Sequence, residues 1–147
     1  MKKQILVVDD DTSVREMLGR VLAGEGYLAR AAANGAEALA IAAGDQLDLV
    51  LLDLNLPGKS GWDVFERLTT EHPLLPVIIV TARSNQLFPA LAAGAGALLE
   101  KPMDFPSLLQ VVSRLLAESP EARRARMAGR AAEFIYNSAR NDEGKLS

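Results

Sequence analysis

Five short, mainly apolar segments alternate with longer stretches of helical spacing, and this alternation limits the fold more than any other feature of the 147-residue sequence. The segments are residues 4–8, 27–32, 47–52, 76–80 and 96–100, of which the second is the least apolar. Near-continuous apolar runs of this length are typical of parallel strands that are covered on both faces. Because strand and helix patterns alternate five times, the sequence predicts an α/β fold, a doubly wound (βα)5 domain with a parallel five-stranded sheet.

The stretches between these segments carry apolar residues three or four positions apart, as expected of helices that bury one side. Side chains that can cap a first turn precede three of them: Asp11 or Thr12 the first, Ser60 the third and Asp104 the fifth. We read Asp11 as such a cap rather than as a metal ligand.

A sixth helix is expected after these five units. Ser119 suits an N-cap, Pro120 fits the first turn, and Glu121 complements the helix dipole. Apolar residues at i, i+4, i+7 and i+8 then predict an amphipathic helix: Met127, Ala131, Phe134 and Ile135. We therefore expect a domain over residues 1–118, an amphipathic helical extension over residues 119–140 with its helix from about Pro120 to about Ala139, and a disordered tail over residues 141–147. This helix could fold back on the domain, mediate dimerisation or bind a partner.

Functional groups in an open parallel sheet gather at the carboxyl ends of the strands. Three carboxylates, a hydroxyl and an amine occur at the predicted strand ends. They are Asp9 and Asp10 after the first strand, Asp53 after the third, Thr81 after the fourth and Lys101, followed by Pro102, after the fifth. Although these residues are far apart in sequence, we expect them to meet at one edge of the sheet.

Three neighbouring carboxylates repel one another, so a proton or a cation must relieve them. An all-oxygen cluster without His or Cys favours a hard cation, and Mg²⁺ is the usual one that keeps water ligands and leaves room for a phosphate oxygen. A carboxylate shielded in this way can attack phosphorus and form an acyl phosphate. The pattern therefore points to Mg²⁺-dependent phosphoryl transfer.

Composition excludes several other kinds of site. The chain has no cysteine and a single histidine, His72, so disulfides, thiolate metal sites and histidine clusters are ruled out. The apolar run after Lys2 and Lys3 is too short for a secretory signal, and no stretch approaches the length of a membrane span, so we expect a cytoplasmic protein without a membrane association. Residues before Ser119 carry a formal charge of about −5 and the rest about +2, so direct nucleic-acid binding is not expected.

At these residues the chain resembles a response-regulator receiver domain of two-component signalling, of the CheY-like superfamily. Five segments carry the resemblance, in order: "VVDDD", "LLDLNLPGKSG", "VIIVTA", "GAGALL" and "EKP". The resemblance extends from about Lys3 to about Ala117, and it implies the strand order 2-1-3-4-5. Each segment is weak by itself, but the five together, each at its own strand end, are highly specific.

The resemblance implies a role for each residue of the acidic cluster. Asp53 would be the residue that accepts the phosphoryl group. Mg²⁺, or Mn²⁺, would be bound directly by Asp10, by Asp53 and by the backbone carbonyl of Asn55. Asp9 would act through a water molecule or from the second shell.

The resemblance also implies how a phosphoryl group would be sensed. Lys101 would pair with its oxygens, and Thr81 would move to hydrogen-bond them. Leu98 stands where the family often has an aromatic residue that swings inward, so an aromatic version of the switch is not expected. The loop beside the metal would be shaped by Pro57, Gly58 and Pro102, with a cis bond between Lys101 and Pro102.

In this family phosphorylation changes the face made by the fourth helix, the fifth strand and the fifth helix, here around residues 87–92, 96–100 and 104–116. The implied partners are a sensor histidine kinase or histidine phosphotransfer protein and an unknown output partner. The resemblance also allows a homodimer, formed through that face or through the extension. His72 is not the expected donor. Such a chain would be a signalling protein rather than an enzyme.

Two alternative functions are a phosphohydrolase and a phosphorylation-independent interaction module. Against the phosphohydrolase, the sequence has no second acid directly after Asp53.

Overall fold

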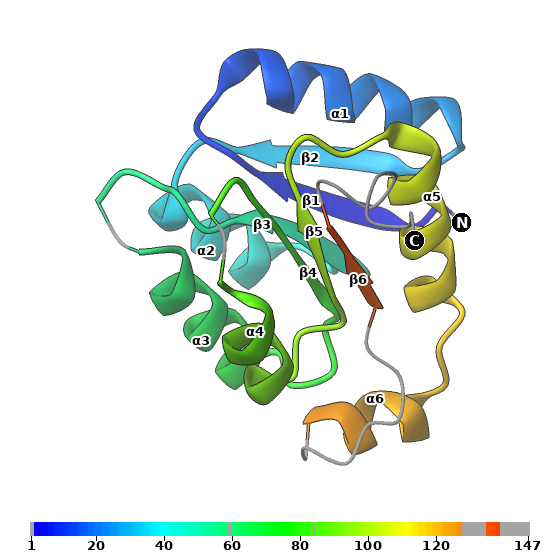
Figure 1. The fold of residues 1–147 in the computed structure, drawn as a ribbon. Helices are drawn as coiled ribbons and strands as arrows, with labels where there is room; N and C mark the ends of the chain where they lie inside the picture. Colours follow the sequence, from blue (N-terminus) through cyan, green and yellow to red (C-terminus); the bar gives the residue numbers. More distant parts are fainter. Residues whose placement is uncertain (1, 59, 84, 128–134, 139–147) are drawn as a thin grey trace, which may run out of the picture.

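The computed structural model describes residues 2–58, 60–83, 85–127 and 135–138 of the chain. A central parallel sheet has helices on both faces (Figure 1). The strands are β1 Gln4–Val8, β2 Leu28–Ala32, β3 Leu49–Asp53, β4 Val77–Thr81, β5 Ala97–Glu100 and β6 Ile135–Asn137. The helices are α1 Thr12–Gly24, α2 Gly35–Gly44, α3 Gly61–Glu71, α4 Leu87–Ala93, α5 Phe105–Leu116 and α6 Pro120–Met127.

The sheet has the order β2-β1-β3-β4-β5-β6, and every described pair of neighbouring strands is parallel. The predicted doubly wound fold and the order 2-1-3-4-5 are confirmed. The register places Asp53 of β3 beside Val80, and Thr81 of β4 beside Glu100. The carboxyl ends of β3, β4 and β5 therefore lie next to one another.

Alternate residues of each strand face two separate apolar cores. One core contains Leu6, Leu52, Ile79 and Leu98 and is covered by α2, α3 and α4. The other contains Val7, Leu51, Val80 and Leu99 and is covered by α1 and α5. Since β3 and β4 are buried along their whole length, the near-continuous apolar runs are explained by packing on both faces.

Caps fix where the helices begin. Asp11 accepts hydrogen bonds from the backbone N–H groups of Ser13 and Val14, so it is the N-cap of α1, as predicted. Ser60 caps α3 and Asp104 caps α5 in the same way, which confirms both predictions. No helix formed by the described residues is long and apolar enough to cross a membrane.

The loop between β3 and α3 is held by a close backbone approach at Gly61. Its N–H donates to the carbonyl of Leu54 at 3.1 Å, and a Cβ on this glycine would lie 2.3 Å from the Cα of Leu54. Gly58, in the middle of the loop, has a φ of 79°, which favours glycine. This contact fixes the start of α3 against Leu54, the residue that follows Asp53.

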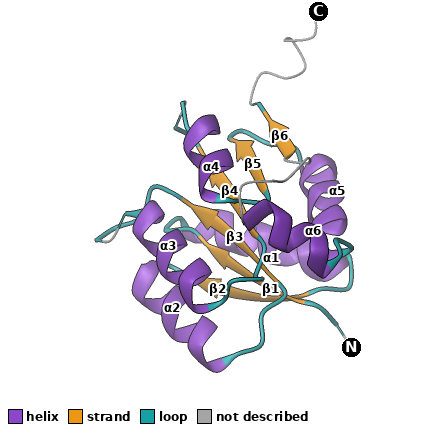
Figure 2. Ribbon diagram, turned by 90° about the horizontal axis from the view of Figure 1, so that it is seen from below, coloured by secondary structure: helices purple, strands orange, loops and turns teal. Residues whose placement is uncertain are grey.

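The predicted helical extension is only partly correct. Helix α6 begins at Pro120, and Ser119 accepts a hydrogen bond from the N–H of Ala122, as an N-cap does. However, the prediction of a helix to about Ala139 is wrong, because residues 135–137 form strand β6 against β5 (Figure 2). The free edge of β5 offers unpaired backbone groups, and Ile135 and Tyr136 are good strand formers, so sheet pairing outweighs the helical pattern there. Residues 128–134 and the predicted disordered tail, 141–147, lie outside the described residues.

Candidate functional site

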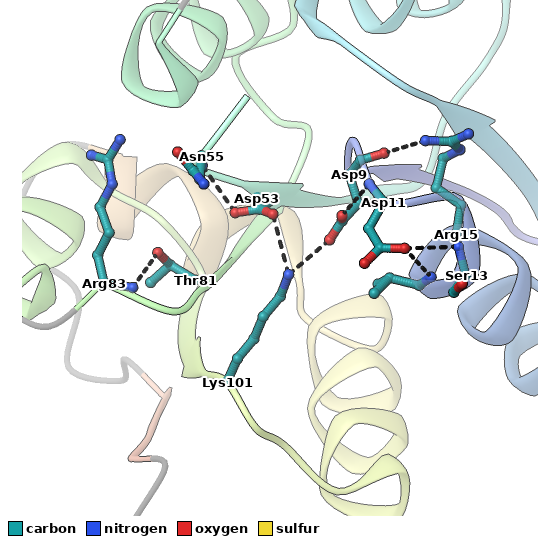
Figure 3. Close-up of polar contacts among 10 residues, drawn as sticks. Asp9, Asp11, Ser13, Arg15, Asp53, Asn55, Thr81, Arg83 and Lys101 are labelled. Carbon is teal, nitrogen blue, oxygen red and sulfur yellow. Dashed lines mark hydrogen bonds and ion pairs between the residues drawn. The ribbon is translucent and has the colours of Figure 1, made fainter. Parts of the chain in front are cut away.

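Residues from four separate strand ends meet at the carboxyl edge of the sheet (Figure 3). Asp53 ends β3, Thr81 ends β4, and Lys101 follows β5. Asp9 and Asp10 follow β1, and each of the three carboxylates has an oxygen within 4.8 Å of the others. The predicted clustering of the acidic residues is therefore confirmed.

The members of this cluster differ in exposure. Asp9 is 3% exposed, Asp53 is 5% exposed and Thr81 is fully buried, whereas Asp10 is exposed to solvent. Buried charges are stable only when they are paired or bind a metal. Asp9 and Asp53 therefore require partners, while Asp10 faces the side from which a ligand can enter.

Lys101 supplies one of these partners. Its Nζ atom donates to Oδ2 of Asp9 at 2.9 Å and to Oδ2 of Asp53 at 3.2 Å. Its backbone N–H donates to the carbonyl of Thr81 at 2.8 Å. Lys101 thus links the two buried carboxylates to each other, and it also ties the end of β5 to the end of β4.

Backbone N–H groups bind the remaining oxygens of the site. The N–H of Asp11 donates to Oδ1 of Asp9 at 3.0 Å, and the N–H of Asn55 donates to Oδ1 of Asp53 at 2.9 Å. In each case the donor lies two residues after the acceptor, as in an Asx turn. These turns fix the orientation of both carboxylates before any ligand binds.

The protonation of Asp53 and Lys101 follows from this environment. Burial raises the pKa of the Asp53 carboxyl above its ordinary value of 3.8, and the Asn55 N–H and the Lys101 charge only partly oppose that rise. Burial by itself lowers the pKa of Lys101, but the hydrogen bond to Asp9 and the charge of Asp53 outweigh it, so the pKa lies above 10.5. Lys101 is therefore a cation throughout the physiological pH range.

The donor set of the cluster fits a hard divalent cation. The cluster consists of three carboxylates, without a sulfur or imidazole ligand among them. Oxygen ligands of this kind are those that Mg²⁺ and Mn²⁺ prefer. A cation would also relieve the repulsion that one ammonium group cannot fully balance against three negative charges.

The other predicted site residues lie around this cluster or apart from it. Asn55, Pro57 and Gly58 are exposed in the loop after β3, and the Lys101–Pro102 bond is cis. Leu98 is fully buried in the core beneath α4 and does not face the acidic cluster. His72 is the C-cap of α3. It lines the same hollow as Lys3 and Asp48, at the amino ends of the strands and away from the acidic cluster.

Sequence reasoning missed two contacts near the site. Arg15 donates to the backbone carbonyl of Asp9 at 2.7 Å, a contact across six residues that no local spacing rule indicates. The indole N–H of Trp62 donates to Oε1 of Gln86 at 2.8 Å, which links α3 to the loop between Thr81 and α4. Because Trp62 and Gln86 are 24 residues apart, this contact depends on the tertiary fold and no local pattern indicates it.

An apolar hollow of about 420 Å³ lies directly beside the acidic cluster. It is formed between α1 and the loop that leads from β5 to α5, and Lys101 belongs to its wall. The side chains that make it apolar include Val14, Met17, Met103 and Phe105. Met17 is one of the most exposed large apolar residues among those described.

Comparison with known proteins places this arrangement in a family. The profile described as "Response regulator receiver domain" matches residues 5–113. NtrC of Escherichia coli (strain K12), a DNA-binding transcriptional regulator, is 38% identical over 125 residues, which cover 83% of this chain and 26% of NtrC. The response regulator MprA of Mycobacterium bovis (strain BCG) is 38% identical over 140 residues, which cover 93% of this chain and 61% of MprA. The chain thus spans only part of the length of these relatives.

Solved structures agree with this match. A CheY-like response regulator receiver domain protein from Methanospirillum hungatei superposes with a TM-score of 0.76 at 32% identity, covering 79% of this chain and 94% of the other. The response regulator TrrA from Thermotoga maritima, solved in complex with Mg²⁺ and BeF, gives a TM-score of 0.72 at 35% identity, covering 77% and 98%. Since the family profile also matches well over half of the sequence, the chain belongs to the response regulator receiver domain family.

Proposed function

We propose that this receiver accepts a phosphoryl group on Asp53 and passes the change to a partner or to an output region. The observation that carries this proposal is the buried Asp53 carboxylate, which lies beside Asp9, Asp10 and the Lys101 ammonium at an edge of the sheet open to solvent. Receiver domains are signalling modules rather than enzymes. The chain would therefore catalyse only its own phosphorylation and dephosphorylation.

The transfer itself is a displacement at phosphorus. An oxygen of Asp53 forms the new P–O bond while the P–N bond of a phosphohistidine, or the P–O bond of a small acyl phosphate, breaks. The imidazole leaves with a proton, or the carboxylate leaves as an anion. The Asn55 N–H binds Oδ1 of Asp53, while Oδ2 of Asp53 accepts from the Lys101 ammonium group.

A divalent cation is part of this proposal, with Mg²⁺ or Mn²⁺ as the candidates. Asp10, Asp53 and the backbone carbonyl of Asn55 would bind it directly, and Asp9 would act through a water molecule or from the second shell. When bound, the cation neutralises negative charge on the transferring group.

Lys101 and Thr81 are the residues positioned to respond to the new charge. A phosphoryl group carries about −1.5 to −2 charge and three terminal acceptor oxygens, and on Asp53 it replaces the single charge of the carboxylate. Lys101 already contacts Asp53 and can donate to one of these oxygens. The hydroxyl oxygen of Thr81, which now accepts from the N–H of Arg83 at 3.0 Å, can turn to donate to another. We infer that this exchange moves the β4–α4 loop.

A protein donor is supported by the apolar hollow between α1 and the β5–α5 loop. A sensor histidine kinase or a histidine phosphotransfer protein must bring its phosphohistidine to Asp53. The exposed Met17, with Met103 and Phe105, provides an apolar surface beside Lys101 on which such a protein can pack.

Two other functions are weaker candidates. A phosphohydrolase would need a general acid near the phosphorylated carboxylate, and Leu54 and Asn55 after Asp53 provide none. A phosphorylation-independent interaction module would not require buried acids that lower stability when unliganded. The acidic cluster therefore supports the phosphoacceptor.

Intact-protein mass after incubation with acetyl phosphate tests this proposal. Wild-type protein with Mg²⁺ should gain the mass of one phosphoryl group, whereas Mg²⁺-free protein and Asp53→Asn should not. Asp11→Asn is a matched control, since it removes a neighbouring charge and keeps the cap. If no adduct forms and beryllofluoride also fails to bind, the interaction module becomes the better account. Turnover of ordinary phosphate esters would instead support a phosphohydrolase.

A further inference from the structure

Strand β6 covers the lateral side of the sheet, along β5. Strand β6 pairs in parallel with β5, with Ile135 beside Ala97, Tyr136 beside Leu98 and Asn137 beside Leu99. Figures 1 and 2 both place β6 alongside β5. Without β6, the N–H and C=O groups on this side of β5 would be free to pair with another strand.

The attachment of β6 is weak compared with the rest of the sheet. It has three residues, of which Ile135 packs half-buried against the core under α1 and α5, while Tyr136 is 40% exposed. The N–H of Ile135 reaches the carbonyl of Gly96 at 3.4 Å, which is longer than an ordinary hydrogen bond. On the other side of β5, Lys101 N–H reaches Thr81 at 2.8 Å.

Strand β5 connects this edge to the acidic cluster. It leads directly into Lys101, whose ammonium group contacts Asp53 and whose N–H is bound to Thr81. Its residues Leu98 and Leu99 are fully buried in opposite cores, so β5 cannot shift without disturbing its neighbours. Any displacement that starts at Lys101 should therefore break the weaker contact, which is the one with β6.

We propose that β6 is a displaceable cap, bound to the β5 edge in the unmodified chain and released when Asp53 carries a phosphoryl group. This inference rests on the proposed function and adds a regulatory element to it. While β6 is in place, the backbone groups on this side of β5 are covered by the chain itself and are not available to another strand. Release of β6 would make that edge available only in the phosphorylated state.

Two adjacent amides of β5 report on the two edges separately. Because the N–H of Lys101 points to β4, the alternation along a strand directs the N–H of Leu99 to β4 and that of Leu98 to β6. Both residues are fully buried and belong to the same strand. Leu99 is therefore an internal control for Leu98.

Amide hydrogen exchange measured by NMR on the full chain tests the cap. Mg²⁺ and beryllofluoride serve as the phosphoryl analogue, and fluorine NMR of the bound beryllofluoride reports occupancy of the site independently. On loading, exchange at Leu98 should become faster by about tenfold or more, while exchange at Leu99 stays within about twofold. An unchanged or slower Leu98 in loaded protein would overturn the cap and leave the phosphoacceptor intact.

Variants at Ile135 open the cap without loading the site. Ile135→Asp should give fast exchange at Leu98 in the absence of beryllofluoride, with Leu99 still protected, because a charged side chain cannot pack on the apolar core. Ile135→Val, which keeps the apolar contact, should behave as wild type. Protection of Leu98 that survives Ile135→Asp would show that β6 does not cover this edge. Failure of beryllofluoride to bind wild-type protein would contradict the proposed function together with the regulated release.

Discussion

The Nζ atom of Lys101 lies 2.9 Å from Oδ2 of Asp9, a carboxylate that is almost completely buried, and Lys101 also reaches Asp53 at 3.2 Å. Lys101→Met would leave both acids without this cation. Since Lys101 is partly exposed, we expect a loss of about 1–3 kcal/mol in the free energy of unfolding at pH 7, below the full cost of breaking a buried pair.

Urea unfolding without Mg²⁺ measures this loss. Lys3→Met removes an exposed lysine at the other edge of the sheet and should change stability little. Equal effects of the two variants would mean that the contact of Lys101 with Asp9 does not stabilise the fold.

The raised pKa of Asp53 predicts a pH-dependent effect of Asp53→Asn. Burial favours the protonated carboxyl. The contribution of Asp53 to the free energy of unfolding is therefore fully present below pH 3.8, and it is lost as the pH rises through the higher folded-state pKa of this carboxyl. At pH 7 without Mg²⁺, Asp53→Asn should therefore be more stable than wild type by about 1 kcal/mol. The difference should shrink as the pH falls toward 4.

A series of urea denaturations between pH 7 and pH 4 would measure this trend. Glu66→Gln, which removes an exposed carboxylate from α3, serves as the charge control. A stability difference between Asp53→Asn and wild type that is independent of pH would contradict the assignment of the cost to the Asp53 charge.

Removal of Asp10 should weaken metal binding without harming the fold, because its side chain is exposed. A Mg²⁺ concentration of 100 times the dissociation constant stabilises a protein by about 2.7 kcal/mol. We expect Asp10→Asn to show clearly less stabilisation than wild type at the same Mg²⁺ concentration. Thermal unfolding with and without Mg²⁺ measures the effect, and Asp11→Asn should retain the full increase because Asp11 caps α1. If Asp11→Asn instead lost the stabilisation by Mg²⁺ and Asp10→Asn kept it, Asp11 rather than Asp10 would be the metal ligand.

The close approach of Gly61 to Leu54 predicts a large effect of a single methyl group. In Gly61→Ala the new Cβ would overlap backbone atoms of Leu54, so the β3–α3 loop behind Asp53 must move, at a cost of about 1–3 kcal/mol. Gly24→Ala, at the end of α1, has no atom within 4 Å of its Cβ and should be neutral or slightly stabilising. Chemical denaturation of both variants compares them. A neutral Gly61→Ala would show that the loop can relax without cost.

The amino-acid sequence by itself determined the strands β1 to β5, the helices α1 to α5 that alternate with them, and the residues of the acidic cluster. The reason is that each of these depends on local chemistry: apolar runs of strand length, caps such as Asp11 and Ser60, and polar residues directly after strands. Once the strands are parallel, their carboxyl ends must share one edge, so Asp9, Asp53 and Thr81 meet there.

Only the tertiary structure decided how the cluster is paired and how the sheet ends. Lys101 binds both Asp9 and Asp53, and Asp10 remains exposed, because of the relative heights of four strand ends, which no local pattern encodes. Residues 135–137 satisfy a helical spacing as well as a strand propensity, and the open edge of β5 decided between them. An unpaired strand edge rewards a strand partner with backbone hydrogen bonds that an isolated short helix cannot match.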